Sequence, residues 1–369
     1  MMLRILRSFV KTKFVMIMKR RLFYLGMLVV LALFSACSNK SGKRVFAPTS
    51  SGRPYELLVV IDQGMWERPA GRALYNVLDS DVPGLPQSER SFRIMYTDPA
   101  NYDSTLKLIR NIIIAEVDGT RFTQPKFKYT KDVYAAPQVI LTIQAPDENS
   151  FEKFVEENTQ VIVDFFTHAE MNRQIVLLEN SHSDYISTKV KSLFDCDVWV
   201  PSELTSTKEG ENFFWAGTNT ATADRNFVIY SFPYTDVNVF TKEGFIQKRD
   251  SVMKVNIPGA REGMYMMTDS LMTEVKPITV QGEYALEIRG LWRVKGDFMG
   301  GPFVSHARVD RANQRVIVAE VFVYSPDKMK RNLIRQMEAS LYTLKLPNSK
   351  AENVEIPVET VQQDTDANK

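Results

Sequence analysis

The sequence predicts an α+β protein with mixed or antiparallel sheets flanked by helices and with a strand-rich second half. Three observations favour this class. Apolar stretches of strand length alternate with amphipathic helical stretches over residues 54–180, and strand patterns dominate residues 181–347. Three segments, starting at Val139, Phe227 and Val316, each run from an apolar strand through a proline and a capping residue into a helix. This repetition fits either a duplicated α/β unit or ordinary strand-to-helix punctuation.

The N-terminus has the organisation of a secretion signal. Three basic residues, Lys19–Arg21, follow Met18, and an apolar run of 13 residues occupies positions 22–34. That run suits the apolar core of a signal peptide and is shorter than the roughly 20 residues that span a bilayer. We therefore expect residues 1–36 to be a signal peptide, with Met18 as the natural start.

Cys37 directly follows the small residues Ser35 and Ala36, a pattern that resembles the bacterial lipobox. In that resemblance Cys37 is lipidated and becomes the first mature residue, although Phe34 stands where the pattern prefers leucine. An ordinary signal peptide, with Cys37 as a bystander, is the alternative. Residues 37–53 are rich in serine, glycine and basic residues and predict a flexible tether.

The charges of the tether residues also predict where in the cell envelope the protein lies. Lipoproteins that reach the cell surface in the Bacteroidota often carry acidic residues after the lipidated cysteine, whereas Lys40, Lys43 and Arg44 stand here. By this resemblance we expect a lipid-anchored outer-membrane protein that faces the periplasm and contacts the membrane through its N-terminal lipid.

Net charge and cysteine content further restrict the possible functional classes of the protein. The chain carries 46 basic and 44 acidic residues, a formal net charge of +2. Seven of the basic residues lie in residues 1–36, so the mature chain keeps 39 basic against 44 acidic residues, a net charge of −5. This balance predicts no nucleic-acid partner. Cys196 is the only cysteine besides Cys37, so we expect no disulfide and interpret Cys196 as a buried, inert thiol.

The elements of the first half follow from apolar spacing and helix-capping residues. Strands are predicted at 54–62, 92–97, 110–119 and 136–147. Helices are predicted at 68–80, in a short turn started by Asp98–Pro99, and from the end of the last strand to about residue 195. The apolar stripe of that long helical stretch comprises Phe151, Phe154, Val155, Val161, Ile162, Phe165 and Phe166.

The second half, 181–347, contains mostly strands. They are predicted at 197–201, 211–216, 225–233, 262–268, 274–281, 284–294, 302–310 and 315–324. Helices are predicted near 241–255 and at 326–344, the latter with Ser325 as its N-cap. The polar tail, 348–369, is predicted to be disordered.

Long strings in this half carry a resemblance to a known family. They are GEYALEIRGLWRVKGDFMGGPFVSHARVD, from residue 282, and RVIVAEVFVYSPDKMKRNLIRQMEASLYTLKLP, from residue 315, supported by FVIYSFPYTD and PGAREGMYMMTD. The chain resembles the Bacteroidota lipoprotein family catalogued as domain of unknown function 4837. The resemblance covers most of the mature chain and implies export, lipidation and a body that belongs to one family. It assigns no catalytic residue.

Residues with catalytic or metal-binding potential are few. No nucleophile elbow, zinc-protease helix or phosphate-binding loop occurs in the sequence. The three histidines, His168, His182 and His306, are too scattered to suggest a metal site, and we expect neither a metal nor a cofactor.

Residues 284–324 are predicted to form a central antiparallel meander. A hairpin turn at 311–314 would place His306 opposite Ala319 on a face of mixed polarity. Trp292 lies on an alternating apolar face and is expected to be buried, as is Phe303 on the next strand.

Two acidic residues of this meander have two interpretations each. Glu320 stands inside an apolar strand, where a carboxylate must be paired or protonated. It is either an acid with a raised pKa beside a cleft or one partner of a structural ion pair with Arg289 or Arg308. Asp297, followed by Gly300–Gly301, belongs either to a ligand-binding loop or to a long hairpin turn.

Two functions remain open. The preferred one is a non-catalytic envelope lipoprotein that binds an envelope protein or a glycan. The alternative is a periplasmic hydrolase that uses two acidic residues as acid and base. The candidate residues are Arg289, Trp292 and Arg308 for ligand binding and Glu320, Asp297 and His306 for catalysis.

Overall fold

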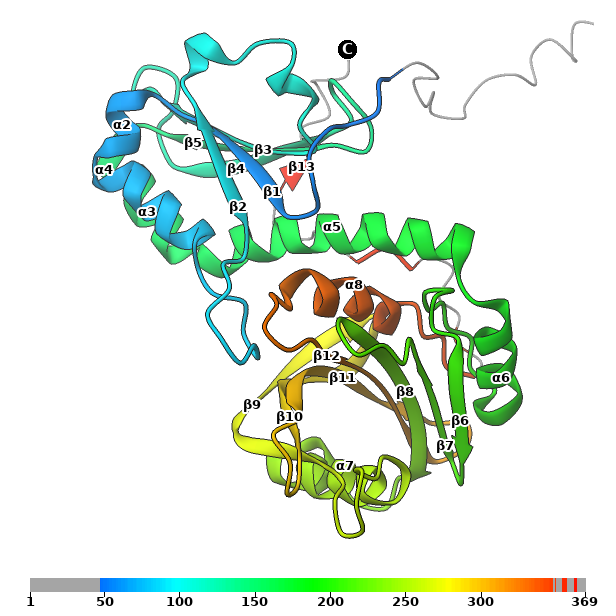
Figure 1. Cartoon of the computed structure of the whole chain (residues 1–369). Helices are drawn as coiled ribbons and strands as arrows, with labels where there is room; N and C mark the ends of the chain where they lie inside the picture. Colours follow the sequence, from blue (N-terminus) through cyan, green and yellow to red (C-terminus); the bar gives the residue numbers. More distant parts are fainter. Residues whose placement is uncertain (1–46, 348, 350–353, 357–361, 364–369) are drawn as a thin grey trace, which may run out of the picture. The chain divides into compact units, whose positions relative to one another are not determined.

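The computed structural model describes residues 47–347, 349, 354–356 and 362–363 (Figure 1). Residues Pro48–Lys369 form one compact unit, and the description below concerns that unit alone. The predicted signal peptide, Cys37 and most of the predicted tether lie outside the described residues. No helix within the described ranges is long and apolar enough to cross a membrane.

A six-stranded mixed sheet organises the first half. Its order is β13-β4-β5-β3-β1-β2, with β1 Glu56–Val60, β2 Arg93–Thr97, β3 Asn111–Val117, β4 Lys126–Lys131, β5 Val139–Ala145 and β13 Gln362–Gln363. β1 runs parallel to β2 and β3, β3 runs parallel to β5, and β4 is antiparallel to β5. The mixed sheet confirms the predicted class. β4 is absent from the prediction because charged side chains alternate along it with Phe127 and Tyr129.

The side chains of the parallel strands alternate between two buried faces. On one face, residues such as Leu57, Val59 and Ile113 pack against helices α2 (Gln63–Glu67), α3 (Pro69–Leu78), α4 (Glu148–Glu157) and α5 (Thr159–Ser181). On the other face, Leu58 and Val60 pack against the segment that contains the short helices η1 (Pro99–Asn101) and η2 (Leu106–Leu108).

The described residues of the C-terminal tail are packed against this first half. Val354 and Ile356 are buried, and the backbone of Ile356 is hydrogen-bonded to the side chain of Asn172 on α5. β13 pairs in parallel with β4. The expectation of disorder throughout 348–369 is therefore wrong for these residues, because two apolar side chains and an open sheet edge hold them.

A seven-stranded antiparallel sheet forms the second half. Its order is β6-β7-β8-β12-β11-β10-β9, with β6 Ser206–Gly210, β7 Phe213–Gly217, β8 Asp224–Pro233, β9 Met266–Val280, β10 Glu283–Val294, β11 Gly300–Asp310 and β12 Arg315–Tyr324. One face packs against α7 (Lys242–Asn256), which follows the short helix η3 (Val237–Phe240). The other packs against α6 (Asp184–Phe194) and α8 (Arg331–Tyr342). Figure 1 shows α7 and α8 on opposite sides of the curved sheet.

The register of the meander agrees with the prediction. His306 pairs with Ala319 and Ser305 with Glu320, and Trp292 is only 3% exposed. His306 differs from expectation in one respect, because the face of mixed polarity is covered. Its ring is fully buried and meets the ring of Tyr342 edge-on, with 4.8 Å between centroids.

Several predicted elements also differ from the structure. Asp197 and Pro201 form isolated bridges in place of a strand over 197–201, and the edge strand is β6 instead. The strands predicted at 262–268 and 274–281 are one continuous strand, β9. α8 begins at Arg331 and not after Ser325, because its N-cap comes from elsewhere in the chain. The buried carboxylate of Glu89 accepts hydrogen bonds from the backbone N–H groups of Lys330 at 2.7 Å and Arg331 at 2.8 Å.

We predict that Trp292→Ala lowers the free energy of unfolding by about 3–5 kcal/mol, because it empties a buried aromatic site. The indole packs edge-on against Phe322, with centroids 5.5 Å apart, and its Nε1 donates to Val323 O at 3.3 Å. Phe298→Ala, in the same hairpin but fully exposed, is the matched control and should have almost no effect. Urea unfolding of both variants provides the measurement. Equal stability of the two variants would show that this hairpin is peripheral to the core.

Candidate functional site

Glu320 is sealed inside the second half and does not face a cleft. Its carboxylate is fully buried and accepts hydrogen bonds from Arg249 Nε at 2.8 Å, Arg249 Nη2 at 2.6 Å and Ser305 Oγ at 2.7 Å. The partner is therefore Arg249 of α7, and not Arg289 or Arg308. The two residues lie 71 positions apart, and they meet only because α7 packs against this face of the sheet.

The guanidinium of Arg249 is enclosed by partners. It also donates from Nη1 to Thr268 Oγ1 at 2.8 Å, and it lies 4.1 Å from the centroid of the Phe303 ring. Burial lowers the pKa of Arg249, but the charge of Glu320 and its hydrogen bonds outweigh this and raise the pKa overall. A buried ion pair is tolerated in a protein core when its donors and acceptors are hydrogen-bonded, and this pair meets that condition.

Asp297 lies in the turn between β10 and β11, where its side chain is exposed. Its Oδ1 accepts hydrogen bonds from the backbone N–H groups of Phe298 at 2.6 Å and Met299 at 3.3 Å, which matches the hairpin-turn interpretation. Gly301 belongs to β11 and not to a loop. A Cβ there would lie 2.1 Å from Val323 O, so glycine allows the close approach of the two strands.

A cavity of about 440 Å³ at this hairpin brings Asp297 and Trp292 together. Its walls combine aromatic, aliphatic and polar side chains, and the aromatic ones include Trp215, Phe322 and Tyr324. Neither Glu320 nor His306 lines it, so the three catalytic candidates do not share this cavity.

Arg308 is also committed to the core. Its Nη1 donates to Leu344 O at 2.7 Å and its Nη2 to Glu283 Oε2 at 3.1 Å. The side chain is fully buried, and burial lowers its pKa. It lines neither of the two cavities described here, although sequence reasoning placed it among the ligand-binding candidates.

A larger cavity, of about 640 Å³, contains Arg289, the remaining ligand-binding candidate. We call it the charged cavity. Residues of α5, α8, β9, β10 and the segment 80–91 line it. The charged groups of its inner wall are Glu287, Arg289, Arg335 and Glu338.

These charged groups form a row of alternating sign. Arg289 Nη1 donates to Glu338 Oε2 at 3.1 Å, and Nη2 donates to the other oxygen of the same carboxylate. The same Nη2 also lies 3.3 Å from Glu287 Oε2. His306 extends the row behind the wall, with Nε2 at 3.8 Å from the same Glu287 oxygen. Neither of its ring nitrogens has a hydrogen-bond partner among the described residues.

The row changes the protonation behaviour of its members. Burial by itself raises the pKa of Glu287, but the charge of Arg289 and the contact with His306 outweigh it, so the pKa lies well below its usual range. Burial likewise lowers the pKa of Arg289, and the charges of Glu287 and Glu338 more than reverse this. Both groups therefore stay charged over the physiological range.

The positions of these four residues on β10 and α8 explain why their side chains lie together. Glu287 and Arg289 stand two residues apart on β10 and so share one face of the strand. Arg335 and Glu338 stand three residues apart on α8 and so share one side of the helix. Gly84, at φ +76°, allows the segment 80–91 to lie against Arg289, where a Cβ would come within 2.6 Å of Cγ.

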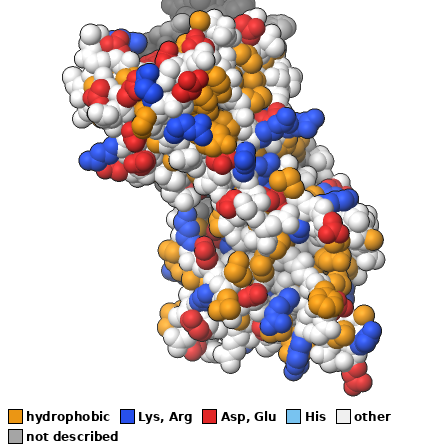
Figure 2. Space-filling view, turned by 60° about the vertical axis from the view of Figure 1, so that its left-hand side comes forward, with side chains coloured by type: hydrophobic (Ala, Val, Ile, Leu, Met, Phe, Trp, Pro, Cys, Tyr) orange, Lys and Arg blue, Asp and Glu red, His pale blue; other side chains and the backbone are white. Residues whose placement is uncertain are grey.

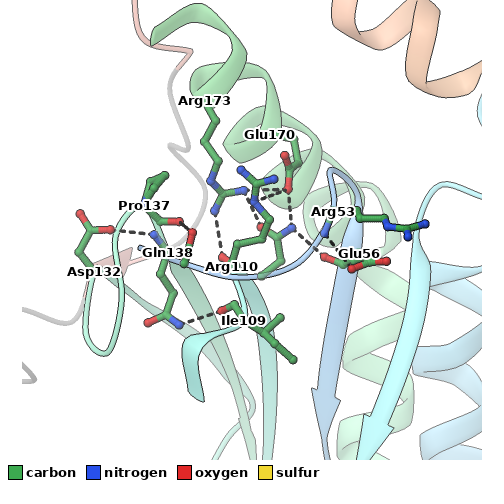
Figure 3. Close-up of polar contacts among 11 residues, drawn as sticks. Arg53, Glu56, Ile109, Arg110, Asp132, Pro137, Gln138, Glu170 and Arg173 are labelled. Atoms are coloured by element: carbon green, nitrogen blue, oxygen red, sulfur yellow. Dashed lines mark hydrogen bonds and ion pairs between the residues drawn. The ribbon is translucent and has the colours of Figure 1, made fainter. Parts of the chain in front are cut away.

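A second charged cluster ties α5 to β3 (Figure 3). Glu170 Oε1 accepts hydrogen bonds from Asn111 Nδ2 at 2.6 Å and Arg173 Nη1 at 2.9 Å, and it lies 3.6 Å from Arg110 Nε. Arg173 Nη2 also donates to Arg110 O at 2.9 Å. None of these four residues lines either cavity, so the cluster fixes the helix against the sheet.

Sequence reasoning missed Glu287, Arg335 and Glu338. A signal for the last two does exist, since Arg335 and Glu338 sit directly beside the apolar positions Ile334 and Met337 of α8. Charged residues that adjoin the apolar stripe of a helix are expected at its boundary with the core.

The described residues give less support to a metal site or to a surface of one dominant charge. Within the described ranges, no group of three His, Cys, Asp or Glu side chains is placed to hold a metal ion. On the face drawn in Figure 2, acidic, basic and apolar side chains are interspersed, and neither sign of charge dominates.

We predict that Glu287→Gln lowers the free energy of unfolding at pH 7 by about 1–3 kcal/mol, because Arg289 loses one of two carboxylate partners. The pKa of Glu287 in the folded protein lies below its unfolded value of about 4.3. Its stabilising contribution is therefore present above about pH 4.3 and disappears as the pH falls towards the folded pKa.

The measurement is urea unfolding of both proteins at pH 7 and at pH 3, where the stability gap should narrow. Glu274→Gln is the matched control, at an exposed position on the rim of the same cavity, and should change nothing at either pH. A gap that stays constant down to pH 3 would contradict the assignment.

Comparison with known families divides the chain in two. Residues 50–179 match the family described as domain of unknown function DUF8532, and residues 183–343 match DUF4837. The expected single family over most of the mature chain is thus corrected, because the first half matches a different description. No curated protein matches the chain. The resemblance inferred from the sequence is confirmed for the second half, where residues 183–343 match the family described as DUF4837.

Proposed function

We propose that this protein is a non-catalytic, lipid-anchored envelope protein that binds a ligand, derived from an envelope protein or a glycan, in its charged cavity. The observation that carries the proposal is the charged row of Arg335, Glu338, Arg289 and Glu287 along a cavity of about 640 Å³. The volume falls within the range of small-molecule sites, roughly 300–1,000 Å³. Charges that are fixed by one another present a rigid polar wall, which favours recognition of a ligand by shape and charge.

The alternative, a periplasmic hydrolase, has weaker support. An acid–base pair must reach the substrate from within hydrogen-bonding distance. Glu320 is fully buried and occupied by Arg249 and Ser305, whereas Asp297 caps an exposed turn. They do not share either cavity described above.

The anchoring part of the proposal rests on the N-terminal sequence. A basic segment, an apolar run of signal-peptide length and the small residues before Cys37 favour export and lipidation. The basic residues after Cys37 favour the periplasmic face of the outer membrane. A lipid on a flexible tether would hold the body beside the membrane surface.

The first test is lipidation. Cys37→Ala should move the protein from the membrane fraction to the soluble fraction, because the acyl chains are its proposed membrane contact. Cys196→Ala is the control and should leave the protein in the membrane fraction. Cys196 is fully buried, and burial raises the pKa of its thiol to about 12. Fractionation followed by immunoblotting gives the readout. Membrane association that survives Cys37→Ala would overturn the anchoring proposal.

The second test separates structure from catalysis. Glu320→Gln should lower the free energy of unfolding by about 3–5 kcal/mol, because Arg249 then carries an uncompensated buried charge. Asp297→Asn keeps the Oδ1 acceptor of the turn and should leave both the melting temperature and complementation of a deletion strain unchanged. A stable Asp297→Asn protein that fails to complement would favour the hydrolase.

A further inference from the structure

Arg335 is a buried cation whose charge has no carboxylate of its own. Its side chain lines the charged cavity and is 4% exposed. Nη1 donates to the backbone oxygen of Ser91 at 2.9 Å, and the guanidinium lies 4.6 Å from the centroid of the Tyr55 ring. The neighbouring carboxylate, Glu338, has both oxygens engaged by Arg289. Leaving a buried charge without an ionic partner is costly unless something else compensates it.

One edge of this guanidinium remains free. Among the described residues neither Nε nor Nη2 of Arg335 has a hydrogen-bond partner, and neither is enclosed, so both are open to the cavity. Nε and Nη2 form the edge with which arginine binds a carboxylate in two parallel hydrogen bonds. The same chain shows this geometry elsewhere, since Arg249 holds the two oxygens of Glu320 with its Nε and Nη2 at 2.8 and 2.6 Å.

Unpaired hydroxyls accompany the free edge. Ser91 Oγ is buried and has no partner among the described residues, although the backbone oxygen of Ser91 touches Arg335. Thr167 Oγ1, on α5, is likewise unpaired, and both residues line the charged cavity. Both oxygens are enclosed by protein atoms, so neither can reach a group in the cavity, and the carboxylate contact rests on Arg335 alone.

The surrounding charges decide which anion fits. Arg289 is already shared by two carboxylates, and Asp164 and Glu274 stand on the same cavity. Lys276, which also lines the cavity, lies 3.8 Å from Asp164 Oδ2 and is partly neutralised by it. A phosphate with two negative charges would meet these acidic groups, whereas a carboxylate brings a single charge in the planar geometry that the guanidinium of Arg335 matches.

We propose that the Nε–Nη2 edge of Arg335 binds the carboxylate of a small organic monocarboxylate in the charged cavity. This inference rests on the proposed function, since it names the chemistry of the ligand that the cavity takes. The carboxylate belongs to one of two sources, an amino-acid derivative such as the end of a peptide, or an acidic sugar.

The experiment uses the full chain in detergent and two matched pairs of probes. N-acetylalanine is compared with N-acetylalaninamide, and glucuronate is compared with glucose, with dissociation constants measured by NMR titration. In one pair or the other, the carboxylate should bind roughly tenfold or more tightly than its neutral counterpart, the effect of a charge-assisted bidentate contact. The pair in which it does so identifies the source.

Variants assign the contact to its residues. Arg335→Lys should weaken carboxylate binding roughly tenfold or more, because lysine cannot reproduce the planar fork. Arg331→Lys is the matched control on the same helix, outside the cavity lining, and should leave binding unchanged. Should Arg335→Lys fail to fold, the Nε–H resonance of Arg335 in the unaltered protein provides the second measurement. It should shift on titration with the carboxylate and stay in place with the neutral counterpart.

Equal binding within both probe pairs, carboxylate binding unaffected by Arg335→Lys, or an Arg335 Nε–H resonance that the carboxylate does not shift overturns this inference while leaving a cavity that binds ligands. The proposed function is tested separately with Val163→Trp, which places a bulky side chain in the lining of the charged cavity on α5. A folded Val163→Trp protein that complements a deletion strain fully would overturn the binding function itself.

Discussion

The charged cavity depends on the contact between the carboxylate of Glu89 and the start of α8. Helix α8 has no side-chain cap of its own, and the two hydrogen bonds from Lys330 and Arg331 to Glu89 replace it. Because the helix carries Arg335 and Glu338, its starting point sets their depth relative to β10. The segment 80–91 thereby contributes a wall of the cavity and also the cap that positions the opposite wall.

Two buried ion pairs of this protein share one geometry. Arg249 and Glu320 satisfy one another, and so do Arg289 and Glu338, each through two hydrogen bonds. Such pairs contribute little net stability compared with apolar packing, but a displaced partner leaves a charge in the core. An incorrect helix position or strand register would therefore cost free energy. Arg335 alone among these three arginines keeps its carboxylate-binding edge for something outside the chain.

Predictions from the sequence were correct for features that depend on residues close together in the chain. The register opposite Glu320 and the burial of Trp292 follow from side-chain alternation and one turn, and the structure agrees with both. The candidate site was less accessible, because its contacts join distant segments. Nothing in the strand around Glu320 indicates that its partner comes from α7, and nothing near Ser325 indicates that the cap of α8 lies at Glu89.

The place of β13 in the first sheet has a consequence for the order of assembly. Gln362–Gln363 are made after the whole second half, yet they pair with β4 in the half of the chain that is made first. The edge of β4 therefore stays uncovered until the second half has been made. For a chain exported N-terminus first, as we propose, the first half emerges before its last strand is available, and completion of that sheet becomes a late event on the far side of the membrane.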